Sequence, residues 1–294
     1  MYYRRKILLA LLDTFESKLG KLDLQKLLFL YTRNHESPPF HFVPYKYGAF
    51  SFQANADLNT MSKYNQVLER NNWWIKIDNK NYLKEIKNED RINLIKLKNN
   101  FCSYATDELI KYTYINFPFY AINSQVAKDK LSSEDYIRVL ITKPKISGKK
   151  LYTIGYEGIS VEEYFIKLII NDIKVLCDVR NYPRSMKYGF SKNQLKNACD
   201  NLGILYVHLP ELGIIPDKRQ ALETQSDYNN LFSEYKSTTL KENTNDQSHI
   251  LSLIEKYDRV ALTCFESNIH QCHRVPLSKA IESLSNNSIG LLNI

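Results

Sequence analysis

The second half of the chain alternates short apolar runs with amphipathic helical patterns, and this alternation limits the possible folds more than any other feature. The strand-like runs are 151–155, 174–179, 204–209 and 259–265, and the helical patterns are 160–171, 191–202, 226–240, 246–256 and 276–285. Apolar strands that alternate with helices form parallel sheets covered on both faces. We therefore predict an α/β fold, with a Rossmann-like, largely parallel sheet, over residues 151–294.

The first half of the chain combines helical patterns with a basic hairpin. Helices are expected at about 4–18, stopped by Gly20, and then after Asp23 and Ser51, which can serve as N-caps. In the segment 73–84, two strand-like runs flank the turn-forming residues 78–81. This order is typical of a winged helix, a fold that often binds DNA and also serves in protein interaction. We predict a mainly α, winged-helix-like domain over 1–141.

A polar, basic segment separates the two halves. Residues 142–150 contain four lysines and are interrupted by Pro144 and Gly148, so they are the expected linker. Residues 1–150 carry 25 Lys and Arg against 15 Asp and Glu, whereas residues 151–294 carry 15 against 17. A basic half favours a polyanionic partner, DNA in the first place, and we expect Lys76, Lys80 and Lys84 on or near the wing to contact it.

Composition and cysteine usage exclude several other classes of protein. A hydrophobic fraction of 44% with only nine Gly and nine Pro excludes long disorder. No run reaches the ~18 apolar residues that a membrane span needs. The apolar run 7–12 is followed by Asp13 and Glu16, which indicates an amphipathic helix rather than a secretory signal. Five scattered cysteines without a CxxC pair favour a reduced, cytoplasmic setting. The sequence leaves the oligomeric state open.

Ionisable side chains follow every predicted strand of the second half, at the edge where open parallel sheets bind ligands. These residues are Tyr156, Glu157, Asp178, Arg180, His208, Glu211, Glu266, Cys272, His273 and Arg274. Neighbouring carboxylates can differ in pKa and so act as acid and base. We assign Asp178 or Glu266 the role of catalytic carboxylate, with Glu157 in support, and expect the others to bind substrate. The alternative is that Asp178 and Arg180, which alternate along a strand end, pair with other residues in a structural role.

The loop 181–190 is both aromatic and basic. Aromatic rings stack on bases and cations neutralise phosphates, so Tyr188 and Phe190 are candidate substrate contacts, and Arg184 and Lys187 are candidate nucleic-acid contacts. A nucleotide is a further candidate ligand. The alternative is ordinary packing in a Tyr-rich chain.

The cysteines near the last predicted strand have two further interpretations. Zinc ligands normally come as closely spaced pairs, and Cys264 with Cys272 and His273 lacks a second pair, so we predict neither metal nor cofactor. Cys264 lies in an apolar strand and is expected in the core. Cys272 could act as a nucleophile if His273 or a helix terminus lowered its pKa.

Six motifs of the second half together resemble one family. They are Thr153–Gly158, Cys177–Arg180, Tyr188–Ser191, His208–Gly213, Ala261–Glu266 and Cys272–Arg274, and they resemble the family of domain of unknown function 488. The resemblance implies a Rossmann-like α/β domain and supplies no reaction. The segments Leu24–Tyr31 and Tyr45–Ser51 are similar, more weakly, to the Panacea-type antitoxin and phage-associated domain. That similarity implies a setting in mobile elements or phage defence, in which the first half could bind a protein.

These observations favour an enzyme that acts on nucleic acid or on a nucleotide. We expect a hydrolytic step such as cleavage of the N-glycosidic bond of a modified or damaged DNA base, in the manner of a DNA glycosylase. Such a reaction needs a carboxylate, an aromatic clamp and cations for phosphates. Two alternatives stay open: a non-catalytic DNA-binding regulator or antitoxin that senses a nucleotide, and a sulfur-transfer enzyme that depends on Cys272.

Overall fold

The chain folds into two compact units. The computed structural model describes residues 1–33, 35–219 and 222–294. Unit 1 comprises Met1–Lys143 and unit 2 comprises Pro144–Ile294. The mainly helical first unit and the parallel sheet of the second confirm the predicted α/β fold class.

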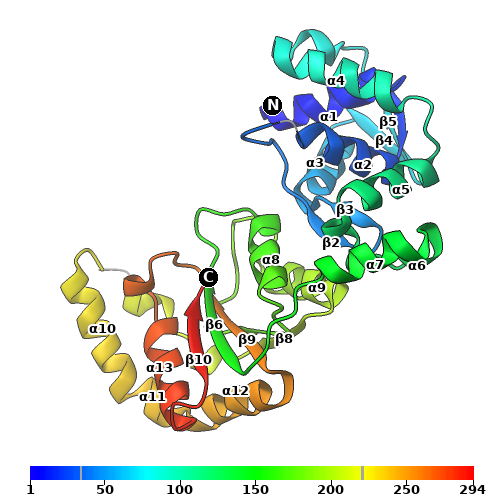
Figure 1. Cartoon of the computed structure of the whole chain (residues 1–294). Coiled ribbons are helices and arrows are strands. Elements are labelled where there is room, and N and C mark those ends of the chain that lie inside the picture. Colours follow the sequence, from blue (N-terminus) through cyan, green and yellow to red (C-terminus); the bar gives the residue numbers. More distant parts are fainter. Residues whose placement is uncertain (34, 220–221) are drawn as a thin grey trace. The chain divides into compact units, whose positions relative to one another are not determined.

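Unit 1 has the order of elements of a winged helix (Figure 1). The elements are α1 (Tyr3–Thr14), β1 (Lys18–Gly20), α2 (Lys21–Thr32), α3 (Phe52–Lys63), β4 (Val67–Arg70) and β5 (Trp73–Lys76). Strand β5 pairs antiparallel with both β1 and β4. The N-cap predicted at Ser51 is confirmed, because its side chain accepts a hydrogen bond from the Ala54 amide at the start of α3. Gly20, in contrast, ends β1 and does not stop α1.

Further elements complete this unit. The hairpin of β2 (Val43–Tyr45) and β3 (Gly48–Phe50) lies between α2 and α3. After β5 come α4 (Asn88–Phe101), α5 (Thr106–Asn116), α6 (Ala127–Lys130) and α7 (Ser133–Thr142). Helix α1 buries six consecutive residues, Ile7 to Leu12, so it is apolar on every side and lies at the centre of the core. Among the described residues, no helix is both long and apolar enough to cross a membrane.

The hairpin of β4 and β5, which corresponds to the wing, lies earlier in the chain than the sequence predicted. Its turn is Asn71–Asn72, two asparagines with φ of 50° and 67°, which suit the left-handed backbone of a tight turn. Trp73–Lys76 is therefore the second strand, and the turn expected at 78–81 is wrong. Those residues instead lead into a 3-10 helix, because the Tyr82 amide donates to Asp13 on α1 at 2.7 Å.

This shift changes the environment of the lysines that were expected on the wing. Lys76 is buried, and its ammonium pairs with Asp13 at 3.0 Å and with Asp78 at 3.1 Å. It is therefore not available to a polyanion in this structure. Lys80 and Lys84 are exposed, but they follow β5 and do not belong to the hairpin turn.

Unit 2 is built on a five-stranded sheet whose strands are all parallel. The strands are β6 (Lys150–Gly155), β7 (Val175–Asp178), β8 (Leu205–His208), β9 (Arg259–Cys264) and β10 (Gly290–Asn293). Their order across the sheet is β10-β6-β9-β7-β8. The first four strands were predicted. The edge strand β10 was not, because its residues are mostly exposed and short strands of this kind carry little hydrophobic signal.

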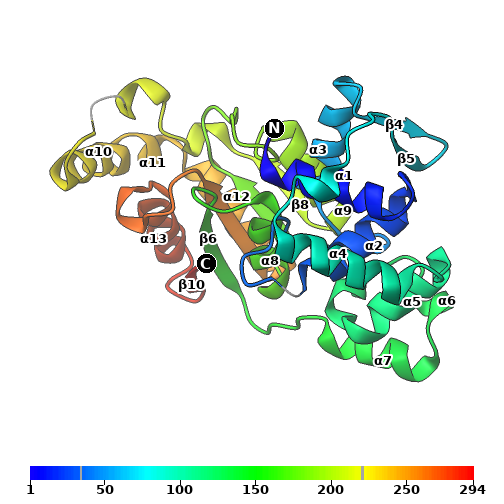
Figure 2. The ribbon, with the colours of Figure 1, turned by 90° about the horizontal axis from the view of Figure 1, so that it is seen from above.

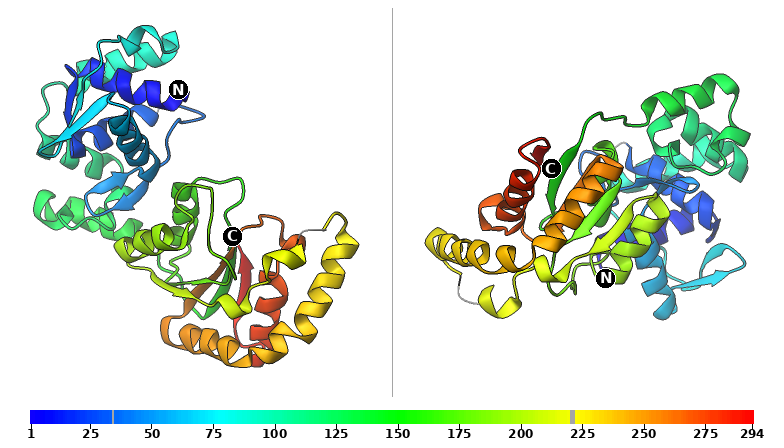
Figure 3. Two further views of the ribbon diagram at one scale, coloured as in Figure 1. Left: turned by 180° about the vertical axis from the view of Figure 1, so that it is seen from behind. Right: turned by 90° about the horizontal axis from the view of Figure 1, so that it is seen from below.

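Helices cover both faces of this sheet, as predicted (Figures 1 and 3). Helices α8 (Val161–Ile170) and α9 (Lys192–Leu202) lie on one face, and α12 (Thr244–Tyr257) and α13 (Arg274–Leu284) lie side by side on the other. Helices α10 (Gln225–Ser237) and α11 (Thr239–Glu242) lie on the far side of the sheet from α8 (Figure 2).

The connections diverge at the carboxyl edge of the sheet. The chain leaves β6 and β7 toward α8 and α9, whereas it leaves β9, which lies between those two strands, toward α13 on the opposite face. Such a reversal opens a crevice at the carboxyl ends of the strands, and ligands of open α/β sheets bind there.

Candidate functional site at the carboxyl edge of the sheet

A cavity of about 370 Å³ occupies this crevice. Its wall is formed by the segments that follow β6, β7, β8 and β9. The side chains in the wall that can bind or transfer charge are Arg180, Arg184, Arg219, Cys264, Glu266 and His273. A cavity therefore lies at the edge of the sheet where the sequence predicted a site, but only some of the candidate residues face it.

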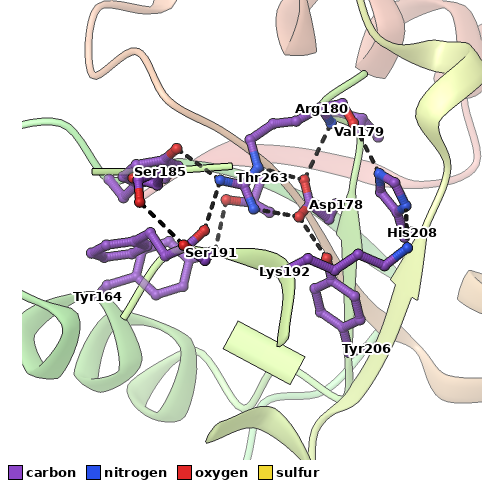
Figure 4. Close-up of polar contacts among 12 residues, drawn as sticks. Tyr164, Asp178, Val179, Arg180, Ser185, Ser191, Lys192, Tyr206, His208 and Thr263 are labelled. Carbon is purple, nitrogen blue, oxygen red and sulfur yellow. Dashed lines mark hydrogen bonds and ion pairs between the residues drawn. The ribbon is translucent and has the colours of Figure 1, made fainter. Parts of the chain in front are cut away.

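Asp178 and Arg180 form a buried ion pair at the end of β7 (Figure 4). Arg180 Nε donates to one carboxylate oxygen of Asp178 at 2.8 Å, and Nη2 donates to the other at 2.5 Å. The Tyr206 hydroxyl donates to the second oxygen at 2.6 Å. Asp178 has no exposed surface, and Arg180 is 6% exposed. Asp178 thus shapes the edge of the sheet, and its carboxylate does not reach the cavity.

The predicted aromatic clamp is packed into the protein. Tyr156 and Phe190 are stacked on one another with ring centroids 4.2 Å apart, and both are buried. The Arg180 guanidinium donates to the Tyr156 hydroxyl at 2.7 Å and to the Phe190 carbonyl at 2.9 Å. Tyr188 is 38% exposed but is not part of the cavity wall. Two rings in the wall are exposed, Tyr182 and Phe265, and the Arg184 guanidinium lies 5.1 Å from the centre of the Tyr182 ring.

Several other predicted contacts lie outside the cavity. His208 bonds the Arg180 carbonyl through Nε2 at 3.0 Å and contacts Lys192 through Nδ1 at 2.9 Å (Figure 4). Glu211 is exposed on a 3-10 helix after β8. The Lys187 ammonium donates to the Tyr156 carbonyl at 2.7 Å, and burial lowers the pKa of Lys187.

Glu157 likewise has a structural position. It is exposed, and one of its carboxylate oxygens accepts hydrogen bonds from the Ser267 amide at 3.0 Å and the Ser267 hydroxyl at 3.1 Å. This contact ties the segment after β6 to the segment after β9. Of the three carboxylates that the sequence singled out for catalysis, Glu266 is the one that lines the cavity.

Glu266 and His273 are linked through one arginine. Arg219 forms an ion pair with the Glu266 carboxylate, and its other terminal nitrogen donates to His273 Nδ1 at 2.7 Å. His273 is buried, and its Nε2 lies 3.1 Å from the Val179 carbonyl, to which it donates. Because Nδ1 accepts from Arg219, His273 is neutral with its proton on Nε2.

Two buried cysteines lie beside Glu266 and His273. Cys272 Sγ donates to a Glu266 carboxylate oxygen at 3.2 Å, and Cys264 Sγ lies 3.6 Å from His273 Nδ1. Burial opposes ionisation of Cys264, but the neighbouring Cys272 thiol and the charges of Arg219 and Arg274 outweigh it and lower the Cys264 pKa. Burial and the neighbouring Cys264 raise the pKa of Cys272. The thiol that faces the cavity is thus Cys264, not the predicted Cys272.

The ligand atoms of Cys264, Glu266, Cys272 and His273 all lie within 4.8 Å of one another. This cluster was not predicted from the sequence, because zinc ligands were expected to come as two closely spaced pairs. The fold supplies the missing proximity, since Cys264 ends β9, and Cys272 and His273 come just before α13, which packs back against β9. The order Cys-x-Glu followed by Cys-His was the available signal.

Gly155 allows the segment after β9 to approach β6. A Cβ atom at this position would lie 2.0 Å from the Glu266 carbonyl oxygen and 3.1 Å from Arg274 Nη2. Only glycine permits so close an approach of two backbones. Arg274 is buried, and its Nη2 donates to the same Glu266 carbonyl at 2.7 Å.

The fold and this edge define unit 2 as a Rossmann-like α/β domain. Residues 160–281, which lie within it, match the family model described as Domain of unknown function DUF488, so the predicted resemblance of the C-terminal half is confirmed. The resemblance of the N-terminal half to the Panacea-type domain is not confirmed by a match. Comparison with curated proteins and with solved structures finds no further match.

Proposed function

We propose that unit 2 is a hydrolytic enzyme that acts on a phosphate-bearing substrate, a nucleotide or a nucleic acid, at the carboxyl-edge cavity. The observation that carries the proposal is that one cavity wall contains three arginines, an exposed tyrosine and the Glu266 carboxylate. One guanidinium group can bind two phosphate oxygens through parallel hydrogen bonds. A carboxylate beside it can accept a proton from water.

Arg184 and Arg219 are the candidate phosphate ligands. Arg184 is exposed, and Arg219 is about a quarter exposed, so both can exchange their present contacts for a substrate. Arg180 is held by Asp178 and contributes fixed positive charge. Tyr182, which is 55% exposed, offers a face on which a base can stack.

Glu266 is the candidate general base. In the structure its carboxylate is held by Arg219 and Cys272. A substrate phosphate that draws Arg219 away frees one carboxylate oxygen to accept a proton from water. In N-glycosidic cleavage the water oxygen bonds to the anomeric carbon, the carbon–nitrogen bond breaks, and the base leaves with its electron pair and takes up a proton.

The proposal locates the chemistry in unit 2 alone. Unit 1 has the element order of a winged helix, but α3, which corresponds to a recognition helix, carries a single basic residue, Lys63, and Lys76 is buried. Free nucleotides are therefore tested alongside DNA. Recruitment of nucleic acid by unit 1 stays a prediction from its sequence.

The test is an assay of the full chain against nucleoside mono-, di- and triphosphates and DNA that contains modified or damaged bases. Released base or phosphate is measured by chromatography and mass spectrometry. We expect Glu266→Gln to lower turnover by about 100-fold or more. Arg184→Ala is expected to raise KM with a smaller effect on kcat, because it removes a binding contact.

Glu242→Gln is the matched control, because Glu242 is an exposed carboxylate on α11, outside the cavity wall. It should leave turnover unchanged. The proposal fails if the wild-type chain releases no product from any of these substrates. It also fails if Glu266→Gln is as active as the wild type.

A further inference from the structure

We infer that Cys264, Cys272 and His273 bind a zinc ion at the wall of this cavity, with Glu266 beside the position of a fourth ligand. Three different donor types from two segments converge here: their ligand atoms, together with the Glu266 carboxylate, lie within 4.8 Å of one another. Two thiolates and an imidazole form a donor set that zinc uses when it keeps one position open.

The spacing of the donors suits a tetrahedral ion. Zinc lies about 2.3 Å from sulfur and about 2.0 Å from imidazole nitrogen, so the sulfur and nitrogen atoms of a tetrahedral site are about 3.6 Å apart. Cys264 Sγ and His273 Nδ1 are separated by 3.6 Å. A metal ion at this site would therefore need little rearrangement of these two side chains.

His273 is held in the tautomer that metal binding requires. Its Nε2 donates to the Val179 carbonyl at 3.1 Å, so Nδ1 presents a lone pair to the cluster. Metal-bound histidines commonly donate their second ring nitrogen to a carbonyl in this way. Val179 directly follows β7, and its carbonyl fixes the ring from the side opposite the donors.

A positive group already contacts two members of the cluster. Arg219 bonds both His273 Nδ1 and the Glu266 carboxylate, so the cluster holds a cation in the structure described. The Arg219 side chain is 24% exposed and can withdraw to solvent when a divalent ion takes its place.

Arg274 would stabilise Cys272 as a thiolate ligand once metal binding displaces the thiol proton. Its side chain is only 1% exposed, and its Nε donates to Cys272 Sγ at 3.0 Å. Within residues 1–33, 35–219 and 222–294, no carboxylate forms an ion pair with Arg274, and its Nη1 has no hydrogen-bond partner. A buried guanidinium requires a compensating negative charge, which a metal-bound thiolate supplies.

The fourth position would face the cavity. Cys264, Glu266 and His273 belong to the cavity wall, whereas Cys272 lies behind it. Water at that position could lose a proton to Glu266, because a zinc-bound water is far more acidic than free water. This last step rests on the proposed hydrolytic function; the metal site does not.

The experiment measures metal rather than activity. The full chain is produced without a polyhistidine tag in zinc-supplemented medium, and its metal content is determined by mass spectrometry of the elements. We expect about one zinc ion per chain. Cys264→Ser, Cys272→Ser and His273→Ala should each lower this content at least tenfold, whereas Glu266→Gln should retain the ion.

Two cysteine variants serve as controls. Cys102→Ser removes an exposed thiol of unit 1, and Cys199→Ala removes a buried thiol of unit 2 outside the cluster. Both should keep the full zinc content. If a cluster variant fails to fold, cobalt(II) is added to the metal-free wild-type chain and the absorption spectrum is measured. Cobalt bound by thiolates produces charge-transfer absorption, which would show that cysteines bind the metal.

The inference is overturned if the wild-type chain binds no zinc and metal-free protein gives no such absorption with cobalt(II). Loss of zinc from Glu266→Gln would show that Glu266 is itself the fourth ligand. The site would then have no open position and would be a structural one. Neither result depends on turnover, so a chain that binds zinc but hydrolyses nothing would refute only the proposed function.

Discussion

Asp178 and Arg180 are two residues apart at the end of β7, and they form an ion pair with two parallel hydrogen bonds that is almost completely removed from solvent. Residues at positions i and i+2 of an extended segment point the same way, which places the guanidinium against the carboxylate. The pair then positions Tyr156, Tyr206 and the Phe190 carbonyl around itself. A motif that resembles catalytic machinery in the sequence is thus a structural support of the cavity.

Asp178→Asn should therefore act mainly on stability. Removing one partner of a buried ion pair leaves the other charge uncompensated and costs about 3–5 kcal/mol, which lowers the Tm of unit 2 by about 10 °C. Circular dichroism follows the melting. Asp200→Asn, an exposed change on α9, should leave Tm within about 1 °C. An unchanged Tm for Asp178→Asn with lost activity would instead assign Asp178 to the chemistry.

Gly155→Ala should disrupt the cavity and its metal site. The new Cβ would lie 2.0 Å from the Glu266 carbonyl oxygen, so the segment after β9 must move away from β6. Gly290→Ala is the matched control, since its Cβ would meet only the Lys150 side chain, at 3.7 Å. We expect zinc content to fall at least fivefold in the first variant and to stay unchanged in the second. Equal zinc content in both would contradict this role of Gly155.

Lys26 should make the stability of unit 1 depend on pH. Burial lowers the Lys26 pKa from 10.5 to about 7, and its ammonium donates to the Tyr47 and Ala49 carbonyls without an acidic partner among the described residues. Between these two values the unfolded chain binds the proton and the folded chain does not. The free energy of unfolding should thus rise with pH, by about 1.4 kcal/mol per unit.

Tryptophan fluorescence can measure this effect in the full chain, because both tryptophans, Trp73 and Trp74, lie in unit 1. Urea titrations at about pH 7.5 and about pH 8.5 should show the rise in the wild type and lose it in Lys26→Met. Lys111→Met, an exposed change on α5, should keep it. The same slope in Lys26→Met as in the wild type would refute the assignment.

Asp90 should hold three helices of unit 1 together. It accepts hydrogen bonds from the hydroxyls of Tyr3 and Tyr31, each at 2.5 Å, and pairs with His35 Nε2 at 3.0 Å. Burial works against ionisation, but these three partners outweigh it and lower the Asp90 pKa from 3.8. The stabilisation is therefore fully present above about pH 4 and is lost as the pH falls through the lowered value.

Asp90→Asn should cost about 1–3 kcal/mol at neutral pH, because a carboxylate oxygen is replaced by a donor that faces another donor. Urea titration followed by tryptophan fluorescence measures the loss. Asp107→Asn removes a partly exposed pair with Lys130 and should cost less than about 1 kcal/mol. Equal losses of unfolding free energy in the two variants would show that the contacts of the buried Asp90 stabilise unit 1 no more than a surface ion pair does.

Much of the fold was accessible from the sequence. Four of the five parallel strands and the helices between them follow from the alternation of apolar and amphipathic segments, because burial on both faces of a sheet imposes that pattern. The turn of unit 1 was placed seven residues too late, at 78–81 and not at Asn71–Asn72. Both segments contain good turn residues, and the contact of Tyr82 with Asp13, far away in the sequence, decides between them.

By itself, the sequence determined that the chain contains a parallel α/β unit and that its ionisable residues gather at the carboxyl ends of the strands. Only the tertiary structure decided which of them face the cavity. Asp178 is paired and buried, Tyr156 and Phe190 stack on each other, and Glu266 reaches the cavity beside Cys264. The physical reason is that strand order and the path of each connection, neither of which is local in sequence, set the direction and burial of these side chains.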